Sequence, residues 1–357
     1  MKKFILFALL SCSYILYGQI PAQYYNAAYN KSGYELKTAL SQIITSGHVS
    51  VTYSSLWTHF RTTDQLPDGT VWDMYSDCTF TFGTNQCGNY KEICDCYNRE
   101  HSFPASWFGG SNTHPMYTDL FHLYPTDGKV NSIRGNDPFG ETANGAQHSI
   151  SKRGASSFPG YTGVVFEPAD EYKGDFARTY FYVATRYESQ IAQWSCPMLA
   201  GNSNSVFTKW ASELLLKWHL QDPVSEKERN RIEVVYGIQK NRNPFIDYPE
   251  LVEMIWGADF EVPFNPEPVS IDNELIDKEN PVSIAPNPIY QHTTITFGNP
   301  FTGVIHLYNM LGRLVYQIPL QSACTQHIDM SNFSSGLYIL KLTSENQPPQ
   351  YKKIIKY

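Results

Sequence analysis

The stretch that decides the fold is CYNREHSFPASWFGGSNTHPMYTDLFHLYPTDGKVNSIRGNDPFGE, residues 96–141. It is the densest polar cluster of the chain, with Arg99, Glu100 and His101 in succession and Asn131 following 30 residues after His101. Glutamate and asparagine offer the hard oxygen ligands that suit magnesium. A neutral histidine can take a proton from water near neutral pH, and arginine can hold phosphate oxygens in bidentate fashion. This inventory suits the hydrolysis of a phosphodiester.

The same stretch predicts its own local structure. If the Glu-His pair lies on one strand, the two side chains point to opposite faces, so we expect a local twist or bulge that brings both to one site. The sequence TDGKVNSIRGN can begin a helix, with Thr126 or Asp127 as its cap. Asn131 and Arg134 are then neighbours at i and i+3. We predict a compact unit of two strands and a helix within an α+β fold.

Four segments of the chain carry a resemblance to a known family. They are NREHSFPASWF, PMYTDLFHLYPTDGKVNSIRGNDPFGE, FEPADEYKGDFARTYFYVATRY and QDPVSEKERNRIEVVYGIQKNRNPFIDYPE. In this order they resemble the endonuclease I family, secreted or periplasmic nucleases with a ββα-metal (His-Me finger) active site. The resemblance covers most of residues 25–257. It implies a nuclease core surrounded by helices, over residues 19–257.

The resemblance also implies a role for each polar residue of the first segment and of the helix that follows. His101 is expected to be the general base that activates water. Glu100 and Asn131 are expected to ligate one divalent ion, with Mg²⁺ as the first candidate and other divalent ions as alternatives. The expected product carries a 5′-phosphate.

Basic residues are the candidates for contact with the substrate phosphates. Arg99 and Arg178 are the first two, and a solvated or salt-bridged arginine is the competing interpretation for each. Lys129 and Arg134 could extend the basic lining of the site. Because such contacts read phosphates rather than bases, cleavage is expected to tolerate any sequence and to weaken with salt.

One position departs from the family pattern. Members often read Asp-hydrophobic-His-His or Asp-hydrophobic-His-Asn, whereas this chain reads Asp119-Leu120-Phe121-His122. Any supporting hydrogen bond from the position of Phe121 is lost, but the base and both ligands are retained, so we expect activity to survive. Four other histidines are interpreted as structural: His114, His122, His148 and His219.

Composition bounds the class of protein. The 357 residues are 42% hydrophobic and 17% charged, which fits a globular chain of two or three domains. The formal charge is −7, so a nucleic-acid partner needs a local basic face. Residues 1–18 read as an export signal, with Lys2 and Lys3 before an apolar run; Ser11-Cys12 only faintly resembles a lipoprotein box. No stable membrane span is expected outside this signal.

Export changes the interpretation of the cysteines, because oxidising compartments favour disulfides. Cys87 is expected to pair with Cys94 or with Cys96, which would staple a turn ahead of the catalytic strand. A zinc site is the alternative, although the single residue between Cys94 and Cys96 does not match the usual zinc knuckle.

Three blocks predict scaffold helices. The first includes YELKTALSQIITSG and closes at Gly47, and the second, SVFTKWASELLLKWHLQDP, is stopped by Pro223. The third, SEKERNRIEVVYGIQKNRNP, opens with Ser225 and Glu228 at the spacing of a capping box.

The composition shifts after Trp256. Residues 258–280 are acidic and rich in proline, which predicts an extended linker. Residues 281–357 contain short β-branched and aromatic runs separated by turn signals, which predicts a small all-β, sandwich-like module. Its motifs APNP, LYNMLGRLVYQI, FSSGLYILKLTS and YKKIIKY resemble the C-terminal sorting domain of type IX secretion. An Ig-like adhesion or carbohydrate-binding domain is the alternative.

Together these features predict a secreted or surface-attached, metal-dependent, non-specific endonuclease. Its expected partners are DNA, with RNA as a further candidate, and the type IX secretion machinery. Two alternatives stay open: a phosphodiesterase or phosphatase acting on small nucleotides, and a surface binding protein whose nuclease activity has weakened. Phe121 is the only sequence support for the last.

Overall fold

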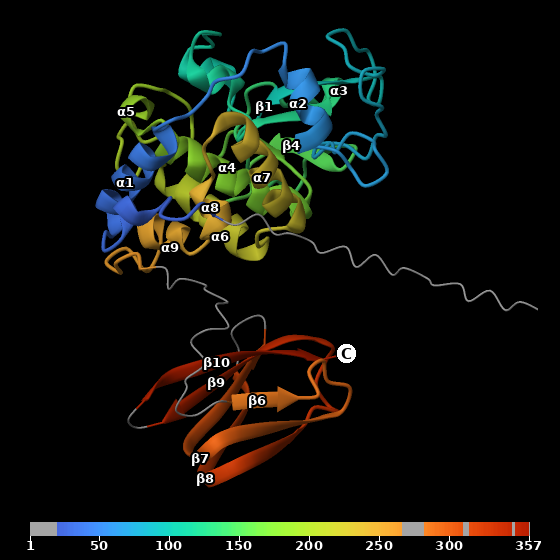
Figure 1. Ribbon diagram of the computed structural model, residues 1–357. Helices are drawn as coiled ribbons and strands as arrows, with labels where there is room; N and C mark the ends of the chain where they lie inside the picture. The colour runs from blue at the N-terminus through green and yellow to red at the C-terminus, as the bar shows by residue number, and fades with distance from the viewer. Residues whose placement is uncertain (1–19, 266–281, 310–313, 345–346, 357) are drawn as a thin grey trace, which may run out of the picture. The chain divides into compact units, whose positions relative to one another are not determined.

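The computed structural model describes residues 20–265, 282–309, 314–344 and 347–356 (Figure 1). The chain divides at about residue 266 into two compact units, which we describe separately. The expected export signal, residues 1–18, lies outside the described residues, and so does the expected linker from residue 266 onward. Within the described ranges, we find no helix with the length and apolar character that crossing a membrane requires.

The first unit combines helices with two small antiparallel sheets. Its α-helices are α1 Gly33–Thr45, α2 Leu56–Thr63, α3 Gly128–Arg134, α4 Lys173–Arg186, α5 Glu188–Ile191, α6 Lys209–Gln221, α7 Glu226–Gln239, α8 Pro244–Asp247 and α9 Leu251–Trp256. Short 3-10 turns lie at Asn26–Ala28, Ala105–Phe108, Pro115–Thr118 and Asp170–Tyr172. The strands are β1 Tyr97–His101, β2 Leu123–Asp127, β3 Ala146–His148, β4 Ser151–Ala155 and β5 Val164–Glu167. β1 pairs with β2, and β4 pairs with both β3 and β5. The predicted mixture of helices and sheet is confirmed.

Helix α4 forms the centre of this unit. All fourteen of its residues are buried, and it packs against α1, α6 and α8 (Figure 1). A helix that is covered on every side can be apolar or internally paired all round, because no face has to meet water. α4 therefore fixes the positions of the outer helices relative to the β1–β2 pair.

The three helices predicted from periodicity are present. α1 ends two residues before Gly47, and α6 ends at Gln221, just ahead of Pro223. Ser225 caps α7 by accepting from the backbone N–H of Glu228, whose side chain in turn accepts from the Ser225 N–H. This reciprocal capping box confirms the prediction from the Ser-x-x-Glu spacing.

The beginning of the acidic segment belongs to the first unit. Phe264 is buried, and its ring lies edge-on to Tyr29 and Tyr248. Its backbone also pairs with Asn30 and Lys31. The expected start of the linker at residue 258 therefore moves to about residue 266, because burial of the phenylalanine outweighs the polar composition around it.

The second unit is an all-β module, as predicted. Its strands are β6 Val282–Ala285, β7 His292–Asn309, β8 Leu314–Asp329, β9 Gly336–Ser344 and β10 Gln347–Lys356. They form one antiparallel sheet in the order β10-β9-β7-β6, with β8 also pairing with β7. Its own apolar core includes Ile305, Leu340 and Tyr338. This tyrosine therefore packs inside the module and is not exposed for binding, as an aromatic side chain of a carbohydrate-binding surface would be.

Candidate active site

Strands β1 and β2 and helix α3 form one continuous unit that carries most of the candidate residues. The strands pair without a register shift, from Tyr97 opposite Asp127 to His101 opposite Leu123. α3 starts at the residue after β2 and contacts both strands. The pairing contains no bulge, so of the two expected alternatives, a twist or a bulge at the Glu-His pair, only strand twist remains to bring the two side chains toward one site.

Alternation along β1 separates its polar side chains into two sets. Asn98 and Glu100 face α3, where the amide of Asn131 donates to the Asn98 carbonyl oxygen over 2.8 Å. One turn further along α3, Arg134 donates to Glu100. Two contacts therefore join β1 to α3. Asn98 and Glu100 are two residues apart on the strand and Asn131 and Arg134 are three residues apart on the helix, so each pair lies on one face of its element. The side chains of Arg99 and His101 point to the opposite face of β1.

Glu100 is held in a polar pocket inside the protein. Its Oε1 accepts from the Tyr75 hydroxyl at 2.9 Å and from Arg134, and only 5% of the residue is exposed. Arg134 is itself fixed by donating to the Ser102 carbonyl at 2.6 Å. Burial raises the pKa of the Glu100 carboxyl, and the charge of Arg134 opposes that rise. Both side-chain donors end on Oε1, so Oε2 is the oxygen that remains for another ligand.

His101 lies at the end of β1 among aromatic side chains. Its Nε2 lies 3.0 Å from the carbonyl oxygen of Tyr117, and its ring neighbours include Tyr53, Phe108 and His122. Because a carbonyl only accepts, Nε2 carries the proton and Nδ1 keeps a free electron pair. Burial, together with the nearby His122, lowers the pKa of His101 to about 3. The imidazole is therefore neutral at neutral pH, with Nδ1 unprotonated.

Arg99 is held in place by two aromatic rings. Its guanidinium carbon lies 3.6 Å from the ring centre of Tyr53 and 4.5 Å from that of Trp57. Its NH1 donates to the Tyr53 carbonyl at 2.9 Å. These contacts engage one nitrogen of the guanidinium and its two flat faces. The side chain is half-buried and makes no ion pair within the described chain. Arg99 therefore keeps donors for a phosphate.

The other basic candidates lie in different surroundings. Lys129 is half-buried in the first turn of α3. Arg134 is buried and orients Glu100, and Arg178 is fully buried, with its guanidinium bound to both oxygens of Glu228 at 2.5 and 2.6 Å. Arg178 therefore cannot reach a substrate phosphate, because its donors are satisfied inside the protein. The competing interpretation of a salt-bridged arginine therefore matches Arg178, and the ion pair of Arg134 with Glu100 was not foreseen.

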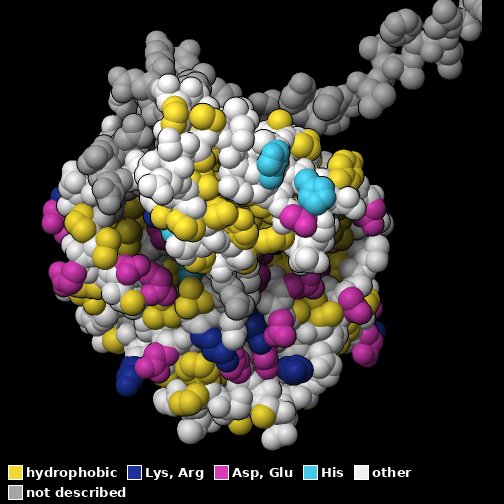
Figure 2. Space-filling model, turned by 90° about the horizontal axis from the view of Figure 1, so that it is seen from below, with side chains coloured by type: hydrophobic (Ala, Val, Ile, Leu, Met, Phe, Trp, Pro, Cys, Tyr) yellow, Lys and Arg dark blue, Asp and Glu magenta, His cyan; other side chains and the backbone are white. Residues whose placement is uncertain are grey.

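The surface charge is mixed. Figure 2 shows one face, on which Lys and Arg side chains lie beside Asp and Glu side chains rather than forming a continuous basic surface.

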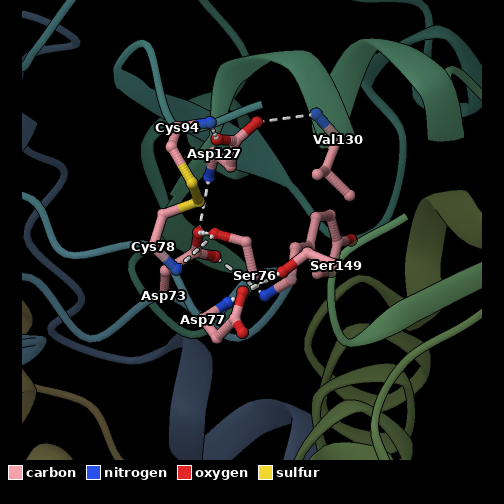
Figure 3. Close-up of a disulfide and its surroundings, with 9 residues drawn as sticks. Asp73, Ser76, Asp77, Cys78, Cys94, Asp127, Val130 and Ser149 are labelled. Atoms are coloured by element: carbon pink, nitrogen blue, oxygen red, sulfur yellow. Dashed lines mark hydrogen bonds between the residues drawn. A yellow bond between two sulfur atoms is a disulfide. The ribbon is translucent and has the colours of Figure 1, made fainter. Parts of the chain in front are cut away.

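Asp127 anchors the start of α3. Its carboxylate accepts from the Val130 N–H at 2.8 Å, as a helix cap, and from the Cys94 N–H at 2.6 Å (Figure 3). Asp73 accepts from the backbone N–H of Asp127 at 2.8 Å. The cap was predicted as Thr126 or Asp127, and Asp127 is the residue used. Asp73 was not foreseen, because a single aspartate far upstream in sequence carries no local signal.

The clustered cysteines form two disulfides, Cys78–Cys94 and Cys87–Cys96. The second is one of the two predicted pairings of Cys87 and is confirmed; the first was not predicted. The ligand atoms of Cys78, Cys94 and Asp127 lie within 4.8 Å of one another (Figure 3). Sulfurs joined in a disulfide are not thiolates and do not ligate a metal. This group of three residues is therefore not a metal site, and the zinc site considered for the clustered cysteines is excluded.

Phe121 lies in the apolar core, where its ring packs 4.8 Å from that of Tyr182. The neighbouring Asp119 is buried and accepts from the hydroxyls of Tyr182 and Tyr187 at 2.8 Å each. His122 is buried and bonds to the Met116 carbonyl, as its structural interpretation predicts. The departure at Phe121 is therefore accommodated by packing in the apolar core.

The three other histidines predicted to be structural are His114, His148 and His219. His114 caps the turn Pro115–Thr118 by accepting from the Met116 N–H, and His219 is buried in α6. His148 is half-buried in β3 and pairs with Ser151 of β4.

Comparison with known proteins agrees with this geometry. Residues 32–250 match the endonuclease I family, and residues 283–357 match the secretion system C-terminal sorting domain. The chain belongs to the endonuclease I family and is a secreted or cell-surface nuclease, an enzyme that hydrolyses phosphodiesters. The family is generally metal-dependent.

Three relatives illustrate the match. The chain is 37% identical over 243 residues to an extracellular ribonuclease of Bacillus amyloliquefaciens, an alignment that covers 65% of this chain and 78% of the relative. An extracellular ribonuclease of Bacillus subtilis (strain 168) is also 37% identical, over 238 residues with the same coverage. Endonuclease-1 of Buchnera aphidicola subsp. Baizongia pistaciae (strain Bp) is 26% identical over 186 residues, which cover 45% of this chain and 67% of the relative.

Proposed function

We propose that the chain is a metal-dependent, sequence-nonspecific endonuclease with a ββα-metal active site in β1, β2 and α3. The observation that carries the proposal is the arrangement of β1. Glu100 faces Asn131's helix on one side of this strand, and the neutral His101 ends the same strand. A hard-oxygen ligand set and a proton acceptor on adjacent residues are what hydrolysis of a phosphodiester needs.

Glu100 and Asn131 fit a divalent ion by their chemistry. Glu100 offers Oε2, and Asn131, whose amide nitrogen donates to Asn98, offers its carbonyl oxygen. A carboxylate oxygen and an amide oxygen are hard ligands, and such ligands favour Mg²⁺ over zinc or copper. When bound, the ion would supply charge stabilisation for the pentavalent phosphate and the departing 3′ oxygen.

His101 is assigned the role of general base through Nδ1. The Tyr117 carbonyl fixes the Nε2–H tautomer and the ring orientation, so Nδ1 is the atom that can accept the proton of the attacking water. Tyr53 and Phe108 enclose the ring and limit the water around it. As Nδ1 accepts the water proton, the water oxygen bonds to phosphorus and the P–O3′ bond breaks. One product then ends in a 5′-phosphate, and the leaving 3′ oxygen takes up a proton from solvent to become a 3′-hydroxyl.

Arg99 is the first candidate to hold the scissile or a neighbouring phosphate, with Lys129 as the second. Arg99 shares a strand face with His101, two residues away, and its guanidinium is already oriented by Tyr53 and Trp57. A preoriented guanidinium loses little rotamer entropy on binding phosphate. We do not assign Arg134 or Arg178 to this role, since their donors are engaged in the interior.

The proposed substrates are DNA and RNA. Phosphate contacts do not distinguish bases, which supports cleavage at any sequence. The relatives named as extracellular ribonucleases support RNA, and the relative named as an endonuclease supports internal cleavage. The match of residues 283–357 to the sorting domain supports export through type IX machinery, with the expected signal at residues 1–18 starting the route.

The test of this proposal uses the purified mature chain with plasmid DNA and, separately, with structured RNA. We expect internal cleavage of both, complete loss after dialysis against EDTA, and recovery on addition of Mg²⁺. Undiminished cleavage in excess EDTA would reject the metal-dependent mechanism. Release of phosphate from mononucleotides without cutting of polymers would instead favour the phosphatase alternative.

A further inference from the structure

A polar cavity of about 470 Å³ lies apart from the β1–β2–α3 unit, between α1 and the junction of α4 with α5. Hydroxyl and amide side chains form much of its wall, including Thr38, Ser41, Gln42, Thr45 and Asn204. Arg186, the last residue of α4, also lines it and is 91% buried. The cavity therefore presents one buried cationic group and several neutral hydrogen-bonding groups.

Arg186 differs from the other buried arginines of the described chain. Each of the other four pairs with a carboxylate: Arg134 with Glu100, Arg178 with Glu228, Arg231 with Asp64, and Arg242 with Asp247. Arg186 has no such ion pair among the described residues. Its NH1 donates to the Thr45 hydroxyl at 2.9 Å, and its buried Nε has no hydrogen-bond partner.

The nearest carboxylates do not supply the missing partner. Glu188 lies in the cavity wall, but its carboxylate accepts from Lys37, whose charge neutralises it, and from the Thr38 hydroxyl. Asp119 is close enough for Arg186 to contribute to lowering its pKa, yet its two oxygens already accept from Tyr182, Tyr187, Gln239 and a backbone N–H. The guanidinium of Arg186 also lies over the ring of Tyr187, 5.0 Å from its centre, but a hydroxyl and an aromatic ring compensate a buried charge less fully than a carboxylate does. An anion that enters the cavity would supply the missing charge.

We propose that this cavity is an oxyanion site and that its ligand is a phosphate group held by Arg186. The guanidinium fork binds two oxygens of a phosphate side by side, and the surrounding hydroxyl and amide groups can donate to the others. The volume exceeds that of a single ion, so the site can accept a phosphate with a sugar attached. Two sources share this chemistry: a phosphate of a bound nucleic acid, away from the point of cleavage, and free inorganic phosphate.

The first experiment measures the thermal midpoint of the full mature chain in EDTA, with inorganic phosphate titrated against sodium chloride at equal ionic strength. We expect a saturable rise of the midpoint with phosphate in the wild type. The rise should be lost in Arg186→Gln and kept in the control Arg229→Gln, which changes an exposed arginine of α7. If Arg186→Gln does not fold, Thr45→Val takes its place as the test. This change removes the hydroxyl that orients Arg186 and should weaken the rise with phosphate. An equal rise in wild type and Arg186→Gln, or none in the wild type, would overturn the proposal.

The second experiment separates the two sources and rests on the proposed nuclease function for its probe. It measures binding of a short single-stranded oligonucleotide in EDTA, where no cleavage occurs. If a nucleic-acid phosphate is the ligand, Arg186→Gln should weaken binding about tenfold and lower the salt dependence by about one phosphate contact. If Arg186→Gln loses the stabilisation by phosphate but binds the oligonucleotide as the wild type does, the oxyanion site is supported and its ligand is free phosphate. Since neither arm reads cleavage, failure of the catalytic proposal would leave both results interpretable.

Discussion

Arg134 and Glu100 form a buried ion pair that ties α3 to β1, and this pair orients the carboxylate assigned to the metal. Arg134 is 1% exposed and Glu100 is 5% exposed, so water screens neither charge. Arg134 also donates to the Tyr75 hydroxyl at 2.7 Å and to the Ser102 carbonyl. These contacts with Glu100, Tyr75 and Ser102 explain why an arginine from the predicted basic lining acts here as a positioning residue.

The first prediction concerns the energy of this pair. Arg134→Met should lower the free energy of unfolding by about 3–5 kcal/mol, because it leaves the Glu100 charge buried and unpaired. The double variant Glu100→Gln/Arg134→Met should cost less than the sum of the two single changes. Urea unfolding in EDTA measures all four corners of the cycle. The exposed pair Lys31 and Glu35 is the control, with an expected coupling of about 0.5 kcal/mol. Additive costs for the buried pair would contradict the prediction.

The sequence predicted the local part of this site well. The cap at Asp127, the i, i+3 spacing of Asn131 and Arg134, and the alternation along β1 all depend on neighbours in the chain. Such features follow from backbone geometry that a short stretch of sequence specifies.

What the sequence could not predict depends on contacts between distant segments. The buried state of Arg178 is set by Glu228, 50 residues away, and nothing near either residue signals the pairing. Helix α4 was not among the helices predicted from periodicity, and its complete burial depends on the helices that pack around it rather than on its own sequence. The disulfide Cys78–Cys94 was missed for a related reason, since connectivity among clustered cysteines is a property of the fold.

The second prediction separates the roles of the two disulfides. Removing either bridge by paired Cys→Ser changes should cost about 3 kcal/mol of stability. The sequence separations are 16 and 9 residues, and the entropy of loop closure depends only on the logarithm of loop length, so the two costs should be close. Only loss of Cys78–Cys94 should raise the Mg²⁺ concentration needed for half-maximal cleavage, since Cys94 donates to Asp127 at the start of the helix that carries Asn131. The Cys87→Ser/Cys96→Ser variant is the matched control. Equal shifts of the metal midpoint in both variants would refute the difference.

The third prediction concerns the dependence of stability on pH. Burial lowers the pKa of His219 from 6.5 to about 4, with the charge of Arg178 adding to the effect. The unfolded chain therefore binds a proton at this residue between pH 6.5 and 4 that the folded chain does not, so folding loses stability as the pH falls through this range. At pH 5 this loss amounts to about 2 kcal/mol.

His219→Gln should remove this share of the pH dependence. We expect the drop in the free energy of unfolding from pH 7 to pH 5 to be smaller in His219→Gln than in the wild type, measured by urea titration at both values. His148→Gln, which changes a half-buried histidine of β3, serves as the control and should keep the wild-type slope. An unchanged slope in His219→Gln would show that this histidine titrates in the same way in the folded and unfolded chain.

The fourth prediction places the boundary between the catalytic unit and the sorting domain. A chain truncated after Asn265 should keep full nuclease activity in vitro, because no candidate catalytic residue lies beyond it, and should stay inside the producing cell. Truncation after Glu261 should also keep the chemistry but unfold more easily, by about 3–5 kcal/mol, since it removes the buried Phe264. Thermal melting and fractionation of the native host measure both effects. Export of the chain that ends at Asn265 would contradict the sorting role.

The last prediction distinguishes the base from the metal ligands. If His101 only removes a proton from water, His101→Ala should lower the cleavage rate by about 10²–10⁴-fold while the Mg²⁺ midpoint and the affinity for DNA stay nearly unchanged. Glu100→Gln or Asn131→Ala should lower the rate and also raise the Mg²⁺ midpoint, because a site with two protein ligands cannot lose one without weakening. The measurement is a metal titration of the cleavage rate for the three variants side by side, with His148→Ala as a control that should match the wild type. Added imidazole should partly restore His101→Ala alone, since the space next to the Tyr117 carbonyl could admit a substitute base. If His101→Ala shifts the Mg²⁺ midpoint as far as Glu100→Gln does, His101 is a ligand, and the water must be activated in another way.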